Sequence, residues 1–145
     1  MLPTSVTVME VSPRDGLQNE DVLVSTDDKL QLIDHALAAG SRRIEVTSCV
    51  HPQRVPQMAD AEAVCAGLPE RSDVRYTGLV LNERGYRRLR DTSLDEAGLV
   101  VPVSNTFGER NQGQSVADAV AMARGVVRDG KLTGFPVHVA LAVAF

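Results

Sequence analysis

The stretches Gly98-Leu99-Val100-Val101 and Val139-Ala140-Leu141-Ala142-Val143 are almost continuously apolar. Strands of this kind are typical of parallel sheets, because both faces of such a sheet are covered and neither side of the strand meets water. A segment with helical spacing separates the two stretches, so strand and helix patterns alternate here. The sequence therefore predicts an α/β fold with right-handed β–α–β connections.

The same alternation extends outward over the whole chain. Strands are expected at residues 6–11, 43–47, 75–81, 97–103 and 137–145. A helix is expected to begin after Ser25 and to end at Gly40, which are typical capping residues. Further helices are expected at residues 59–67 and 83–91 and after Ser115, whereas residues 104–114 are expected to form a loop. No shift in composition marks a linker, so residues 1–145 are expected to lie within one domain.

Two architectures share this pattern. One is an open doubly wound sheet, which a chain of 145 residues could complete. The other is a (β/α) barrel, which needs eight units and about 250 residues. Length favours the open sheet, but no G-x-G-x-x-G motif follows the first expected strand, which argues against dinucleotide binding.

Composition narrows the class of protein. The formal net charge of -4, the 3% aromatic content and the absence of Trp argue against nucleic-acid binding. No apolar run is long enough to span a bilayer, and the N-terminus lacks a secretory signal pattern. Cys49 and Cys65 are too few for a disulfide framework and fit a reducing compartment, so a cytoplasmic location is expected.

Polar residues follow the first expected strand, at the edge where parallel α/β proteins bind ligands. Asp15 could ligate a hard divalent cation through oxygen, and Arg14 could stabilise an oxyanion. A local ion pair within the turn is the alternative. Glu45 lies inside the second expected strand, where it could face inward and meet Arg14, or lie on an edge strand and face solvent.

Other polar residues lie near the ends of strands. Thr47 and Ser48 could contact a ligand or cap a loop. Asn105 and Asn111 follow the fourth expected strand and could bind a ligand or form turns. The histidines show no metal-ligand spacing, and whether His138 faces inward from the fifth expected strand stays open.

The string Val11-Ser12-Pro13-Arg14-Asp15-Gly16-Leu17-Gln18-Asn19-Glu20 resembles the opening motif of the hydroxymethylglutaryl-CoA lyases. These enzymes belong to the DRE-TIM metallolyases, together with isopropylmalate and homocitrate synthases, which typically carry Glu in place of Leu17. Residues 44–48 with 55–60, and residues 104–107 with Asn111, also resemble the lyases. The resemblance covers essentially the whole chain and favours the barrel, here as an incomplete (β/α)8 TIM barrel of about five βα units.

The resemblance implies cleavage of 3-hydroxy-3-methylglutaryl-CoA to acetoacetate and acetyl-CoA, as in leucine degradation. Asp15 matches the metal-binding Asp for Mg²⁺ or Mn²⁺, Arg14 matches the catalytic Arg, and Glu45 matches a Glu that couples to that Arg. Gln18 is expected to position the acyl-CoA substrate, with Thr47, Ser48, Asn105 and Asn111 as further substrate contacts.

Some features of the family do not occur in residues 1–145. Its paired metal histidines, its lid cysteine and an Asn ligand come later in its chain, and Cys49 and Arg54 replace aromatic residues often seen there. Activity of this chain by itself is therefore not expected. The alternatives are a lyase for a related 3-hydroxy-acyl-CoA, or an inactive half-barrel that acts as an interaction module. Open strand edges favour a homo-oligomer or pairing with another chain.

Overall fold

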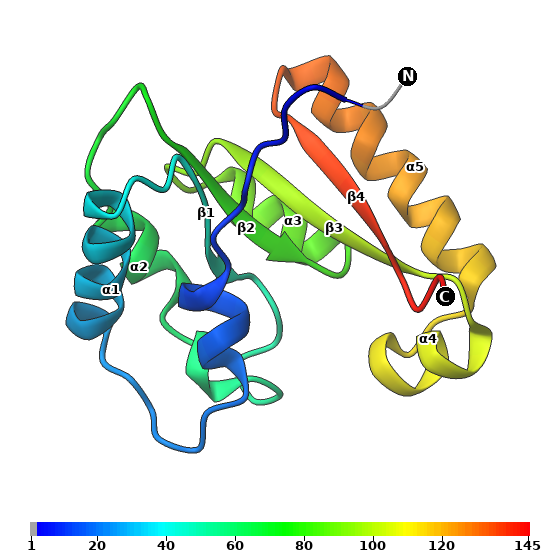
Figure 1. The fold of residues 1–145 in the computed structure, drawn as a ribbon. Coiled ribbons are helices and arrows are strands. Elements are labelled where there is room, and N and C mark those ends of the chain that lie inside the picture. The colour runs from blue at the N-terminus through cyan, green and yellow to red at the C-terminus, as the bar shows by residue number, and fades with distance from the viewer. Residues whose placement is uncertain (1–2) are drawn as a thin grey trace.

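A computed structural model describes residues 3–145 (Figure 1). The strands are β1 (Arg43–Ser48), β2 (Arg75–Val80), β3 (Glu96–Pro102) and β4 (Val137–Ala142). The helices are η1 (Ser12–Gly16), α1 (Thr26–Ala38), η2 (Pro56–Met58), α2 (Ala61–Ala66), α3 (Glu83–Arg90), α4 (Asn105–Gln112) and α5 (Val116–Thr133). Within this described part of the chain, no helix is both long and apolar enough to cross a membrane.

The four strands form one parallel sheet in the order β1-β2-β3-β4. A doubly wound sheet reverses its strand order at a switch point, whereas here each strand pairs with the next one in sequence. Helices α2, α3 and α5 pack against the sheet, and Figure 1 shows the sheet curving past them. This arrangement is that of a partial barrel, so the α/β prediction and the barrel alternative are confirmed.

The first expected strand, residues 6–11, is reduced to one bridge between Glu10 and Ile44. The Glu10 amide donates to the carbonyl of Arg43 (2.9 Å), and the Glu45 amide donates to the carbonyl of Glu10 (2.8 Å). Val6 and Val8 remain about four-fifths exposed. Their β-branched pattern predicted a regular strand, but burial does not stabilise one there, so the sheet has four strands instead of five.

The expected loop at residues 104–114 contains helix α4, so that prediction was wrong. The hydroxyl of Ser104 accepts a hydrogen bond from the Phe107 amide (3.4 Å), which caps the helix. Gly113 ends the helix with a φ of 70°, in the left-handed region that glycine adopts without strain. Few apolar residues mark this helix, which is why its periodicity did not stand out. Strand β4 is also shorter than expected, ending at Ala142.

Candidate functional site

Arg14 and Glu45 form a largely buried ion pair. Helix η1 begins directly after Val11, whose carbonyl accepts from the Asp15 amide (2.7 Å), and this tight turn brings Arg14 over β1. The Nε of Arg14 donates to Oε1 of Glu45 (2.5 Å), and a terminal nitrogen of the same guanidinium contacts that oxygen as well. The side chains are only 14% and 5% exposed. Of the two orientations that the sequence left open for Glu45, the structure shows the buried one that pairs with Arg14.

Asp15 lies at the exposed side of this pair. Its Oδ1 accepts a hydrogen bond from Nη1 of Arg14 (2.8 Å), while 60% of its side chain is accessible to solvent. Arg14 thus holds a buried carboxylate with one part of its guanidinium and an exposed carboxylate with another. An arginine fixed in this way keeps its position without moving when charge develops beside it.

A β-bulge decides where Thr47 and Ser48 point. Glu45 is in register with Thr77, but Thr47 is in register with Gly78, so one residue of β1 is extra. Thr47 is buried and donates to the sulfur of Met58 (3.8 Å). It therefore packs within the protein, which does not support a substrate contact. Ser48 is in register with Leu79, and its buried hydroxyl finds no hydrogen-bond partner within the described part of the chain.

A cavity of about 500 Å³ lies at the carboxyl ends of β1 and β2, within the size range of small-molecule sites. Gln18 and Asn111 both line it, and the buried Oε1 of Gln18 has no hydrogen-bond partner among residues 3–145. Two basic residues, His51 and Arg54, also line the cavity, and no Asp or Glu does. The other lining residues are Val50, Val55, Leu79, Leu81, Asn82, Gln112 and Gln114. The amide side chains of this lining could hydrogen-bond a neutral polar ligand such as an amide. Its basic residues, without a carboxylate beside them, also suit an anionic ligand.

Asn105 does not line this cavity. Its Oδ1 accepts a hydrogen bond from the amide of Val116 (2.8 Å), which ties the start of α4 to the start of α5. The alternative role predicted for Asn105, in stabilising a turn, therefore fits the structure better than a ligand contact does. Asn111 lies at the other end of α4, and the helix places these two amides on different surfaces.

The described residues do not fit a complete divalent-metal site. Among residues 3–145, no group of three or more His, Cys, Asp or Glu side chains lies close enough together to hold a metal ion. Asp15 offers a single exposed carboxylate, and one of its oxygens is already hydrogen-bonded to Arg14. Mg²⁺ prefers six oxygen ligands, so Asp15 alone would bind it weakly.

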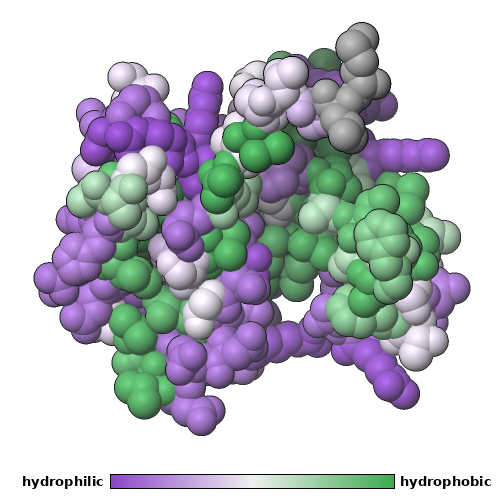
Figure 2. Space-filling model, in the orientation of Figure 1, coloured by the Kyte–Doolittle hydropathy of each residue, from purple (hydrophilic) through white to green (hydrophobic). Residues whose placement is uncertain are grey.

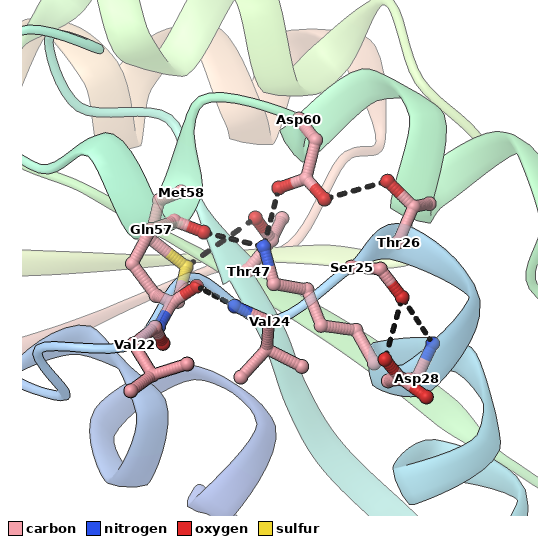
Figure 3. A network of polar contacts seen from close by, with 10 residues as sticks. Val22, Val24, Ser25, Thr26, Asp28, Thr47, Gln57, Met58 and Asp60 are labelled. Atoms are coloured by element: carbon pink, nitrogen blue, oxygen red, sulfur yellow. Dashed lines mark hydrogen bonds and ion pairs between the residues drawn. The ribbon is translucent and has the colours of Figure 1, made fainter.

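Sequence reasoning missed a buried polar network beside the site (Figure 3). The ammonium of Lys29 donates to the carbonyl of Gln57 (2.5 Å) and to Oδ1 of Asp60 (2.6 Å), and its side chain is 4% exposed. The hydroxyl of Thr26 donates to the other oxygen of Asp60 (2.7 Å). A signal for this network was present, because Lys29 and Ile33 are one turn apart on the buried face of α1.

The network also fixes the segment that follows η1. The side chain of Gln57 accepts from the amide of Val24 (2.9 Å) and donates to the carbonyl of Val22 (3.0 Å). The loop between Gln18 and α1 is thereby tied to the loop after β1. The loop after β1 lines the cavity with Val50, His51, Arg54 and Val55, so the network helps to hold that wall in place.

Comparison with known proteins identifies the family. Residues 5–144 match the family model described as HMGL-like. The chain belongs to the HMGL-like family. It is 34% identical over 143 residues to hydroxymethylglutaryl-CoA lyase YngG of Bacillus subtilis, a match that covers 99% of this chain and 48% of that protein. It is 40% identical over 119 residues to the 3-hydroxy-3-isohexenylglutaryl-CoA/hydroxy-methylglutaryl-CoA lyase of Pseudomonas aeruginosa, covering 82% and 40%.

Solved structures of the HMGL-like family show the same fold. The crystal structure of the Bacillus subtilis HMG-CoA lyase superimposes with a TM-score of 0.90 at 34% identity, covering 96% of this chain and 47% of that one. The chain thus spans about half the length of the curated relatives it matches. The resemblance found in the sequence is therefore confirmed: the family and the fold are those expected, and the relatives named above are lyases.

Proposed function

We propose that this chain supplies Arg14, Asp15, Gln18 and Glu45 to the active site of a lyase that cleaves 3-hydroxy-3-methylglutaryl-CoA to acetoacetate and acetyl-CoA. The observation that carries the proposal is the Arg14–Glu45 pair beside the exposed carboxylate of Asp15. Membership of the HMGL-like family, whose curated relatives are lyases, supports it.

In this reaction the bond between C2 and C3 of the substrate breaks. The 3-hydroxyl loses its proton and becomes the ketone of acetoacetate, while C2 takes the electron pair and becomes the enolate of acetyl-CoA, which is then protonated. Arg14 is the group that stabilises the enolate oxygen, because a guanidinium has five N–H donors and the contacts with Glu45 and Asp15 leave some of them free. Glu45 fixes the guanidinium in the orientation that this requires.

The cavity of about 500 Å³ at the carboxyl ends of β1 and β2 is the proposed substrate site. Gln18 and Asn111 line it, and the orphaned oxygen of Gln18 would gain a partner from a bound donor group. The Pseudomonas aeruginosa relative is named for two substrates that differ in the substituent at C3. A related 3-hydroxy-acyl-CoA is therefore the alternative substrate, and turnover of acyl-CoAs that differ only at C3 distinguishes the two.

A divalent cation, Mg²⁺ or Mn²⁺, is proposed as the cofactor, with Asp15 as one ligand among others that lie outside these residues. Asp15→Ala is expected to weaken Mn²⁺ binding, measured by calorimetry on protein that contains the complete site. Asp21→Ala removes a nearby exposed carboxylate and serves as the matched control. Equal affinities of the two variants would remove Asp15 from the metal site.

An inactive half-barrel that serves as an interaction module is the second candidate. Two observations favour it: the described residues contain no metal cluster, and Val139 and Leu141 of β4 are partly exposed. The deciding experiment measures acetyl-CoA release from 3-hydroxy-3-methylglutaryl-CoA in the presence of Mg²⁺, by protein containing these residues. Release that stops on chelation supports the lyase. No release, together with a stable complex through β4, supports the module.

A further inference from the structure

A second polar cluster lies on the sheet next to the Arg14–Glu45 pair, with one residue from each strand. Nε of Arg43 donates to Oε1 of Glu96 (2.6 Å), and the hydroxyl of Thr77 donates to the same oxygen (2.6 Å). Nη2 of Arg43 lies 3.3 Å from Nδ1 of His138. The cluster joins β1, β2, β3 and β4 across the sheet, and the proposed reaction uses none of these side chains.

His138 and Glu45 both border Gly98 of β3. A Cβ atom at position 98 would lie 3.0 Å from Nε2 of His138 and 3.3 Å from Oε2 of Glu45. The two side chains therefore converge on the space above a residue that has no side chain. Oε1 of Glu45 is bound by Arg14, whereas Oε2 is the oxygen that lies near Gly98, on the side of the imidazole's Nε2.

The partners of His138 determine where its proton sits. The guanidinium of Arg43 is always charged and can only donate, so Nδ1 of His138 must accept. The proton of the neutral ring is then on Nε2, on the side of Gly98 and Glu45. Burial lowers the pKa of His138, and the charge of Arg43 lowers it further, while Glu96 and Glu45 oppose the shift. The ring is accordingly neutral near pH 7.

We propose that His138 is a positioning residue for Glu45: held by Arg43 in the tautomer that carries its proton on Nε2, it presents this N–H to Oε2 of Glu45 and leaves Oε1 for Arg14. The carboxylate is thereby fixed from both sides, by β4 and by η1. The consequence for catalysis rests on the proposed function, whereas the tautomer and its contact do not depend on it.

The first test is a direct reading of the tautomer. In the ¹⁵N-labelled 145-residue chain, the imidazole nitrogens of His138 are assigned by long-range ¹H–¹⁵N correlation, with exposed His35 and His51 as internal references. The expected result at pH 7 is a neutral ring with an unprotonated Nδ1 and a protonated Nε2. A proton on Nδ1, or a fully charged ring at pH 7, would overturn the proposal.

The second test separates positioning from mere packing. His138→Gln keeps an N–H donor at the position of Nε2, whereas His138→Leu keeps a similar size without the donor. In protein with lyase activity, His138→Leu is expected to lower kcat roughly tenfold or more with little change in KM, and His138→Gln to restore most of the loss. Equal losses in both variants would contradict a role for the donor. If the protein has no lyase activity while the tautomer is as expected, the proposed function fails and the positioning contact stands.

Discussion

Strands β1 and β4 lie at opposite edges of the sheet, and they differ in what covers them. Residues Ile44 to Ser48 of β1 are all buried, with α2 packed against the strand. In β4, Val139 is 42% exposed and Leu141 is 62% exposed. An apolar groove of about 620 Å³ lies between β4 and α5, lined also by Val101, Val120, Val127 and Leu132. Figure 2 shows a hydrophobic area on this side of the molecule, near the C-terminus.

The difference shows that the residues of an apolar strand are enough to predict that the strand forms. Whether the strand is buried depends on the elements that pack against it. Both strands were expected from sequence, and both formed. The candidate site lies on the β1 side, where Glu45 and Lys29 are buried with partners that hold them. Substitution of these buried residues is therefore expected to lower the free energy of unfolding markedly. Substitution of exposed apolar residues of β4, such as Leu141, is expected to change it little. Three predictions compare buried side chains with exposed ones.

The largest effect on stability is expected at Lys29. Lys29→Met removes the ammonium and leaves the Asp60 carboxylate and the Gln57 carbonyl without their donor. Breaking a buried pair from one side costs about 3–5 kcal/mol, so the free energy of unfolding should fall by an amount in this range. Lys131→Met, at an exposed position of α5 beside the groove, should change it by less than about 0.5 kcal/mol. Urea denaturation of both variants measures the difference, and similar losses would break the contrast.

A matched pair of leucines gives the next effect. Leu89 of α3 is fully buried, and Leu89→Ala should destabilise the chain by about 2–4 kcal/mol through lost burial and a cavity. Leu141→Ala on β4 should cost under about 1 kcal/mol, because most of that side chain is already in water. A cost at Leu141 as large as that at Leu89 would show that β4 is covered in solution, for example by another chain.

The smallest effect is the dependence of stability on pH at His138. Burial lowers the pKa of His138 below its ordinary value of 6.5, so the unfolded chain takes up a proton at a pH where the folded chain does not. Stability from this group is therefore present above pH 6.5 and is lost as the pH falls through the folded pKa. The wild-type chain should lose more stability than His138→Gln between pH 7.5 and 5.5. His35→Gln, at an exposed position, should behave like the wild type.

The sequence predicted which residues come together at the site better than it predicted the direction in which each side chain points. Arg14, Asp15 and Glu45 were expected together, because a turn after one extended segment and an acidic residue in the next strand meet at neighbouring positions of a parallel sheet. The bulge that turns Thr47 toward Met58 was not foreseen, since one extra residue in a ladder leaves no mark in the hydrophobic pattern.

Other failures have different physical causes. Helix α4 was missed because caps at Ser104 and Gly113 define it more than an apolar stripe does. The strand at residues 6–11 was expected because β-branched residues favour extended chain, but pairing requires cover that these residues do not have. The role of His138 depends on Arg43 and Gly98, which come from other strands and can be placed beside it only in three dimensions.

The most direct test of the account compares two arginines in the acetyl-CoA release assay. Arg14 is held by buried Glu45, whereas Arg87 makes an exposed pair with Glu83 on α3. In protein that contains the complete site, Arg14→Gln is expected to lower kcat by about 10²–10³-fold, because a donor aimed at the enolate oxygen is lost. Arg87→Gln is expected to leave kcat unchanged. A rate for Arg14→Gln close to that of Arg87→Gln would contradict the assignment of Arg14 and Glu45 to the catalytic site.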